Sequence, residues 1–241
     1  MKKSKEKKPQ RSAEEQRHDF QTRPDICAYM ASLMPADAVF ILEPTPGDRN
    51  LVDAINKEFK KRGEQHYVVM TPMDYFDQRD IILNRKFHCI LMNPPFSHHT
   101  AILDLAPDDW KNTKGMKFGY KMTLELLQRT DHLIALLPWF TLADSDVRLR
   151  TLYAYGIKSI TALPRAAFAY ARVQTCIIEF SRGYSGPTEF KVFDMLGQTK
   201  HNAPKMDFLD MTTLDRVPDF GRMTNHCHPV KTPKDKSNGQ E

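Results

Sequence analysis

The chain has 241 residues, of which 41% are hydrophobic, and its formal net charge at pH 7 is +5. This length suits one buried core, so we expect one domain of about 200 residues and no second domain. The N-terminus lacks an apolar stretch and no apolar run approaches the roughly 18 residues that cross a membrane, so we expect neither a signal peptide nor a membrane protein.

The excess positive charge is concentrated at the N-terminus. Residues 1–12 contain six basic side chains, one acid and almost no apolar side chain. Such a segment cannot offset the entropy that it would lose on ordering, so we expect residues 1–19 to form a disordered basic tail. Two roles stay open for this tail: it keeps the protein in solution, or it contacts phosphates loosely without reading bases.

Apolar periodicity predicts alternating helices and strands in the domain that follows, which we place at residues 20–196. Thr22 and Pro24 are typical of a helix start. In chain order the predicted elements are helix 24–34, strand 38–42, helix 51–62, strands 66–70 and 87–92, helix 118–129, strand 132–140, helix 144–155, and strands 157–163, 173–180 and 188–194.

This alternation indicates an α/β fold with a mostly parallel sheet and right-handed crossovers. Strands 157–163 and 173–180 are joined by a short link, so we expect them to pair antiparallel. Residues 188–194 alternate as an edge strand does. Beyond Gly197 the pattern decays, and residues 197–241 are predicted to form a loosely packed C-terminal extension.

The cysteines and histidines do not predict a metal site. Cys27, Cys89 and Cys176 lie in apolar stretches, where a reduced cysteine packs as a small hydrophobe, and Cys227 stands far from them. The adjacent residues 226–228 (His-Cys-His) cannot all point at one ion, and no Cys-x-x-Cys pair exists. Reduced cysteines fit a cytoplasmic protein.

The most informative segment chemically is Asn93-Pro94-Pro95-Phe96, directly after an apolar strand. The two prolines hold the backbone extended, so that the Asn93 side-chain oxygen and the Pro94 carbonyl can both accept hydrogen bonds from a planar amine. Acceptors fixed in this way draw the amine nitrogen towards a tetrahedral, nucleophilic form. Phe96 offers a face on which an extruded base can stack. The alternative is an ordinary turn that ends a strand.

Three further segments extend this motif. The sequence reads QTRP at 21–24, ILEPTPGDRNL at 41–51 and DYF at 74–76, ahead of NPPF at 93–96. In this order the motifs resemble those of S-adenosylmethionine-dependent methyltransferases that modify the N6 amine of adenine in DNA, in a compact form similar to phage enzymes. The resemblance covers about residues 20–180. It implies a single Rossmann-like class I methyltransferase domain, somewhat shortened, with an antiparallel last strand.

The resemblance also implies S-adenosylmethionine as the cofactor. The residues implied to line its methionine and ribose are Glu43, Pro44, Thr45, Gly47, Asp48 and Asn50. Thr22 matches an upstream Thr-Pro-type cofactor contact of the family, with Arg23 interposed before the proline. Gly47 allows the backbone to approach a ligand closely, and a carboxylate at Glu43 or Asp48 can pair with an ammonium group. The alternative is that this turn only connects a strand to a helix and binds nothing.

The adenine end of the cofactor is assigned to residues 74–76. Asp74 occupies the position of the acid that accepts from the cofactor's adenine amine, with Tyr75 or Phe76 beside the ring, although a plain loop aspartate remains an alternative. Two features depart from the family. Arg49 stands where a second glycine is expected, and only sixteen residues separate Met70 from Phe87, too few for the usual additional strand-helix unit.

Two segments are candidates for substrate contacts. Residues 97–117 form a long polar insertion that could close over an extruded base, or else a disordered surface loop. The short link before strand 173–180 mixes cations with aromatic side chains, as strand-tracking surfaces do, although a core and its rim would look the same. The residues that we expect to contact substrate are His98, His99, Lys114, Arg165 and Phe168.

Three functions remain under consideration. The favoured one is methylation of adenine N6 in DNA, with the base flipped onto Asn93-Pro94-Pro95-Phe96. The second keeps this chemistry but has another planar amine as acceptor, in RNA or in a protein amide. The third is a catalytically inactive methyltransferase fold that binds nucleic acid or a partner. The sequence leaves the recognition site and the oligomeric state open.

Overall fold

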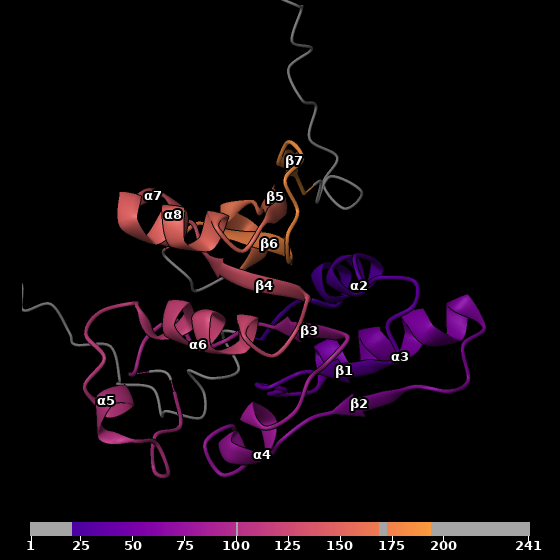
Figure 1. The fold of residues 1–241 in the computed structure, drawn as a ribbon, viewed down its shortest axis with the longest axis horizontal. Coiled ribbons are helices and arrows are strands. Elements are labelled where there is room, and N and C mark those ends of the chain that lie inside the picture. Colours follow the sequence, from indigo (N-terminus) through magenta and orange to yellow (C-terminus); the bar gives the residue numbers. More distant parts are fainter. Residues whose placement is uncertain (1–20, 100, 169–172, 194–241) are drawn as a thin grey trace, which may run out of the picture. The chain divides into compact units, whose positions relative to one another are not determined.

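A seven-stranded sheet between two helical layers organises residues 21–99, 101–168 and 173–193, which are the residues that the computed structural model describes (Figure 1). The strands are β1 (Phe40–Leu42), β2 (Val68–Met70), β3 (Cys89–Met92), β4 (His132–Pro138), β5 (Ile157–Ala162), β6 (Thr175–Ser181) and β7 (Glu189–Val192). Their order is β2-β1-β3-β4-β6-β5-β7. Only β6 runs antiparallel to its neighbours, β4 and β5.

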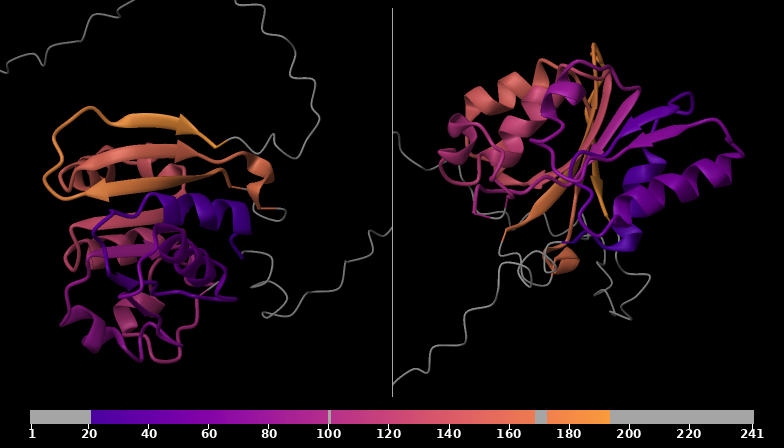
Figure 2. Two further views of the ribbon diagram at one scale, coloured as in Figure 1. Left: turned by 90° about the vertical axis from the view of Figure 1, so that its right-hand side faces the viewer. Right: turned by 90° about the horizontal axis from the view of Figure 1, so that it is seen from below.

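The helices divide between the two faces of the sheet (Figure 2). One face packs against α2 (Pro24–Ser32) and α3 (Asn50–Arg62) around a core that includes Ile26, Ile55 and Phe59. The elements on the other face are α4 (Arg79–Leu83), α5 (Asp108–Lys111), α6 (Phe118–Leu127), α7 (Phe140–Ala143) and α8 (Asp146–Tyr153). A single 3₁₀ turn, η1 (Arg165–Ala167), precedes β6.

The predicted α/β fold with a mostly parallel sheet is confirmed. Every predicted strand is present, although β1, β2 and β3 are each two residues shorter than the apolar runs that predicted them. The pairing of β5 with β6 is antiparallel, as expected, and β7 is an edge strand. The sheet ends at β2 on the other side, and the short stretch after β2 holds only α4.

Two local predictions need correction. Arg23, not Thr22, is the N-cap of α2, and no side chain caps this helix because the Thr22 hydroxyl accepts from Asn93 instead. The insertion 97–117 is not simply a polar surface loop. It contains α5, whose Trp110 is 1% exposed and packs against the rings of Phe76 and Phe118.

The two predicted tails, residues 1–19 and 197–241, which include the 226–228 segment, lie outside the described residues. So do residues 169–172 of the link that mixes cations with aromatic side chains before β6. Cys27, Cys89 and Cys176 are buried free thiols. Among the described helices, none is both long enough and apolar enough to cross a membrane.

Candidate active site

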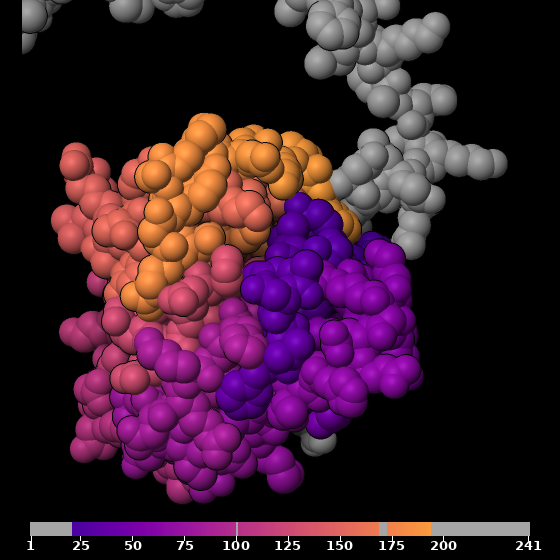
Figure 3. Space-filling model, turned by 45° about the vertical axis from the view of Figure 1, so that its right-hand side comes forward, coloured from indigo at the N-terminus to yellow at the C-terminus, as the bar shows by residue number. Residues whose placement is uncertain are grey.

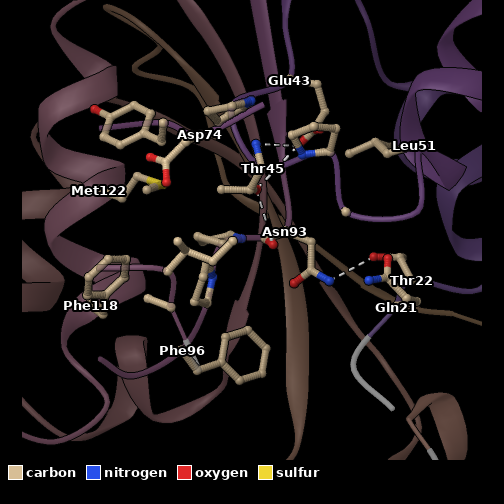
Figure 4. A pocket seen from close by; sticks show the side chains of 18 of the residues that line it. Gln21, Thr22, Glu43, Thr45, Leu51, Asp74, Asn93, Phe96, Phe118 and Met122 are labelled. Carbon is tan, nitrogen blue, oxygen red and sulfur yellow. Dashed lines mark hydrogen bonds between the residues drawn. The ribbon is translucent and has the colours of Figure 1, made fainter. Parts of the chain in front are cut away.

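The candidate site lies where the carboxyl ends of β1, β2 and β3 meet. Because these three strands are parallel and adjacent, the turns that follow them face one cavity, of about 1230 Å³ (Figure 4). A crevice at the carboxyl ends of parallel strands is the usual ligand site of an open α/β sheet.

The cavity gathers most of the residues predicted for the site. It is lined by all four residues of the Asn93–Phe96 motif, and by all ten residues predicted for the cofactor: Thr22, Glu43, Pro44, Thr45, Gly47, Asp48, Asn50, Asp74, Tyr75 and Phe76. Of the five residues predicted to contact substrate, His99 and Phe168 line the cavity, whereas His98, Lys114 and Arg165 do not.

Asn93 is held by contacts from two other segments. Its side-chain Nδ2 donates to Thr22 Oγ1 at 2.8 Å, so the amide oxygen occupies the opposite end of the group, turned away from Thr22 and into the cavity (Figure 4). The Thr45 hydroxyl lies 3.3 Å from the Asn93 carbonyl oxygen. The segment before α2 and the turn after β1 therefore fix the orientation of the Asn93 amide and backbone.

Glu43 is a buried carboxylate that is only half satisfied. It is 1% exposed, and its Oε1 accepts from the Thr45 N–H at 3.0 Å, with the Thr45 hydroxyl 3.3 Å away. Among the described residues Oε2 has no hydrogen-bond partner. Burial raises the pKa of Glu43 to about 8, and the two Thr45 donors and the nearby Arg49 charge oppose this shift. A cationic group in the cavity would satisfy Oε2.

The turn after β1 uses two left-handed residues. Gly47 has φ +48°, and a Cβ there would lie 2.7 Å from Gln21 Oε1, which also accepts from the Asp48 N–H at 3.2 Å. Arg49 has φ +67° and precedes α3 as its N-cap. This conformation explains why glycine is expected at that position, and an arginine there is strained by about 1 kcal/mol.

The turn after β2 presents Asp74 and anchors its neighbours. Asp74 Oδ1 accepts from the Phe76 N–H at 2.7 Å, which closes a tight turn. Tyr75 points into the core, where its hydroxyl donates to Glu125 of α6 at 3.1 Å, and Glu125 also pairs with Arg79 of α4. Burial and the Glu125 charge raise the pKa of Tyr75 well above its usual range. This partly buried cluster of Tyr75, Arg79 and Glu125 fixes the position of the turn after β2.

Helix α6 closes the cavity on the side of the Asn93–Phe96 motif. Phe118 and Met122 of this helix line the cavity (Figure 4). Gly119, between them, faces the prolines: a Cβ there would lie 3.3 Å from Pro94 Cγ and 3.4 Å from the Pro95 carbonyl oxygen. The missing side chain allows α6 to pack directly on the loop that carries Asn93.

The remaining predicted substrate residues have other surroundings. His98 and His99 stack at 3.8 Å between ring centroids, and the buried His98 Nδ1 has no partner among the described residues. Lys114 is exposed, Arg165 is exposed on η1, and Phe168 is 5% exposed, packed within the core on the α2 side. Their predicted contacts with substrate stay predictions.

Several lining residues were not predicted from the sequence. They are Gln21, Pro46, Arg49, Leu51, Thr71, Pro72, Met73, Ser97, Ala101, Ile102, Leu103, Asp104, Met116, Phe118, Met122 and Val173. Gln21 is the first residue of the QTRP segment, so its place in the sequence carried a signal. The apolar residues of α6 have the spacing of a helix that packs against a core. This pattern does not show that one edge of the helix faces the cavity.

No protein-family model and no curated protein matches the sequence. Solved structures do match. A protein of a type I restriction-modification system aligns with TM-score 0.50 and 18% identity, over 78% of this chain and 48% of that one. The methyltransferase subunit of the type I restriction-modification system from Streptococcus thermophilus aligns with TM-score 0.50 and 14% identity, over 72% and 47% of the two chains.

A third similar structure, from Listeria monocytogenes, is described as a class I S-adenosylmethionine-dependent methyltransferase. It aligns with TM-score 0.52 and 17% identity, over 73% of this chain and 66% of that one. The predicted class I methyltransferase fold is therefore confirmed. The chain spans about half the length of the two restriction-modification proteins.

Proposed function

We propose that this chain binds S-adenosylmethionine in the cavity at the ends of β1, β2 and β3 and transfers its methyl group to the N6 amine of adenine in DNA. One observation carries the proposal: Asn93, its amide oriented by Thr22, opens onto the same cavity as the Glu43 turn and the Asp74 turn. The hydrogen-bond acceptors for a substrate amine and the groups suited to the cofactor therefore line the same cavity.

The groups present fit this cofactor. Glu43 Oε2 is a buried acceptor without a partner among the described residues, and it suits the ammonium of a methionine moiety. Gly47 lines the cavity with a left-handed φ of +48°, and because the Gln21 side chain fills the space where a Cβ would lie, this part of the wall requires glycine. Asp74 has one oxygen in the turn and a second available to an adenine amine, with the Phe76 ring beside it. When bound, S-adenosylmethionine supplies an electrophilic methyl group attached to a sulfonium.

The chain's own residues act on the acceptor amine. The Asn93 Oδ1 and the Pro94 carbonyl accept the two amine hydrogens, which localises the nitrogen lone pair for attack on the methyl carbon. With the cofactor bound, formation of the new N–C bond would break the bond from sulfur to that carbon and leave its electrons on sulfur. The amine then loses one proton to solvent. Phe96, the last residue of the motif, provides the face on which the base stacks.

DNA is proposed as the acceptor because two of the similar structures belong to type I restriction-modification systems. Those chains are about twice as long as this one. Adenine in RNA and a protein amide present the same planar amine, and the Asn93–Phe96 motif accepts each of them by the same geometry.

A second candidate function has its own observations. Arg49 adopts a left-handed conformation where glycine is expected, and the sheet ends at β2. Both features lie in the part of the chain that is proposed to hold the cofactor. A fold that binds nucleic acid or a partner without catalysis would tolerate them, and such a protein would not bind S-adenosylmethionine.

The test is transfer of a tritiated methyl group from S-adenosylmethionine to DNA, RNA and protein, with cofactor binding measured by calorimetry. We expect label in DNA. Asn93→Ala should reduce transfer by at least about a hundredfold, since it removes an acceptor that acts in the transition state, and leave cofactor affinity within about threefold.

The control is Asn84→Ala, because Asn84 is an exposed asparagine outside both the cavity and the insertion 97–117. It should transfer label at the wild-type rate. Label in RNA or protein alone would move the proposal to the other acceptors. Absence of cofactor binding by the folded protein would favour the non-catalytic candidate, and unchanged transfer by Asn93→Ala would contradict the mechanism.

A further inference from the structure

Strand β7 leaves an apolar edge at one end of the sheet. In the described part of the chain it pairs only with β5, and it stands outermost (Figure 2). Phe190 is 62% exposed and Val192 is 70% exposed. In the space-filling view the orange segment that contains β7 forms an outer surface of the coloured chain (Figure 3). An exposed apolar edge strand is a template on which another strand can pair.

The backbone of β7 has hydrogen-bonding groups directed outward. The Phe193 N–H donates to the Ala162 carbonyl of β5 at 2.9 Å. Because the side to which a strand's N–H and C=O groups point alternates with a period of two, those of Lys191 also face β5. Those of Phe190 and Val192 therefore face away from the sheet, where they can exchange hydrogen bonds with a further strand.

The side chains of β7 match a second copy of the same strand. If two β7 strands pair antiparallel with Phe190 opposite Phe190, Glu189 of each copy stands opposite Lys191 of the other. Centring the pair on Glu189 or on Lys191 would instead place like charges face to face. Cross-strand charge pairs and aromatic pairs both stabilise a sheet, so the register centred on Phe190 is favoured over those centred on Glu189 or Lys191. Glu189 and Lys191 also form an ion pair within each chain, at 2.7 Å, so opposite charges already lie side by side on this face of β7.

The same register uses the outward backbone groups. Phe190 opposite Phe190 is a pair in which both residues exchange N–H to C=O hydrogen bonds, which requires the outward orientation shown above. The Phe190 ring also contacts Trp139 at 6.0 Å between centroids, so a second Phe190 would extend an existing aromatic contact.

We propose that two copies of this chain associate through β7, antiparallel and with Phe190 at the two-fold axis, to form one continuous sheet. The contact is isologous, as two-fold dimers require. Antiparallel pairing turns the carboxyl ends of the two sheets in opposite directions, so each cavity remains complete within its own chain. The proposal is independent of the function proposed above.

The test is a charge exchange, read by sedimentation velocity of the full chain at low ionic strength across a concentration series. The wild type should form a dimer. Glu189→Lys alone and Lys191→Glu alone each place like charges opposite one another, and each should weaken dimerisation by about tenfold or more. An equal mixture of the two variants restores an attractive pair at both positions and should dimerise at least as well as the wild type.

The mixture also shows that each variant is folded, because an unfolded chain could not recover the dimer. Phe190→Pro removes an outward N–H but no donor to β5, and it should give a monomer. A wild type that stays monomeric at all concentrations would overturn the proposal. This is also the result expected if residues 194–241 cover the edge of β7 within one chain. Single variants that dimerise like the wild type, or a mixture that stays monomeric, would overturn it too.

Discussion

Glu43 links the chemistry of the site to the stability of the protein. Its pKa of about 8 in the folded state lies above the ordinary value of 4.5, because burial disfavours the charged form. The folded state therefore holds its proton more tightly than the unfolded state does. The resulting stabilisation is fully present below about pH 4.5 and is lost as the pH rises through 8, at no more than about 1.4 kcal/mol per pH unit.

We expect Glu43→Gln to remove this pH dependence. The free energy of unfolding without cofactor, measured by urea denaturation between pH 5 and 8, should fall more steeply with pH for the wild type than for the variant. The variant should also bind S-adenosylmethionine at least about tenfold more weakly, because a charged hydrogen bond is lost. Histidines titrate in the same range, so the difference between the two proteins is the test. Parallel pH profiles would contradict this assignment.

Thr22 is expected to act through Asn93. Thr22→Val keeps the shape of the side chain and removes the oxygen that accepts from Asn93 Nδ2 at 2.8 Å. The amide then loses its fixed orientation, so kcat for methyl transfer should fall by about tenfold, while KM for DNA changes little. Thr22→Ser restores the hydroxyl and should restore kcat. A variant with only a lower melting temperature and unchanged kcat would show that Thr22 is merely structural.

Gly119 offers a test in which stability and activity move in opposite directions. Alanine favours a helix over glycine by about 1 kcal/mol, so Gly119→Ala should leave the melting temperature unchanged or raise it. Its Cβ would press on Pro94 and Pro95, and kcat should fall by about tenfold as the acceptors shift. Cofactor affinity should hold, because the contact is with the acceptor side. Full activity in a stable variant would contradict this role.

For single residues, the sequence identified polar side chains that can bind or react, and it missed residues that matter only because of how closely they pack. Glu43 and Asn93 directly follow apolar strands and Asp74 lies in the turn after one, and polar groups in these positions point to a site. Gly119 looks like an ordinary helix residue, because the close approach that requires glycine involves a loop more than twenty residues earlier. Such contacts exist only once the chain has folded.

Among the elements, the insertion 97–117 shows the largest difference between prediction and structure. Its polar composition predicted a surface loop, yet Trp110 anchors it in the core against Phe76 and Phe118. We expect Trp110→Ala to lower the free energy of unfolding by about 3–5 kcal/mol, measured by urea denaturation. Leu105→Ala, at a side chain 58% exposed in the same insertion, should change it by less than about 0.5 kcal/mol. Equal effects would show that the insertion is not anchored.

The strands and the longer helices could be predicted because their apolar runs and helical periods span many residues. Helices α4, α5 and α7 were not predicted, since each has only four or five residues, too few to show a period. The strand order was not predicted either. The antiparallel position of β6 between β4 and β5 depends on pairings between residues far apart in sequence, which local patterns do not encode.

In the molecule as a whole, the part of the chain proposed to hold the cofactor is shorter than in the family that it resembles. Whether it still binds the cofactor therefore decides between the two candidate functions. Among the described residues β2 is the outermost strand on this side of the sheet, and Asp74 is the acid that the turn after β2 brings to the cavity. A cofactor that binds only the folded state stabilises it in proportion to the logarithm of its concentration. S-adenosylmethionine should therefore raise the melting temperature progressively with concentration. No shift at saturating amounts would favour the non-catalytic candidate.

The most direct measurement of the central claim is mass spectrometry of nucleosides from DNA incubated with the protein and S-adenosylmethionine that carries a deuterated methyl group. The account predicts a heavy N6-methyldeoxyadenosine that forms with the wild type and is absent with Asn93→Ala. A heavy methyl group on another base, or none in DNA despite measurable cofactor binding, would contradict the assignment of adenine N6 as the acceptor.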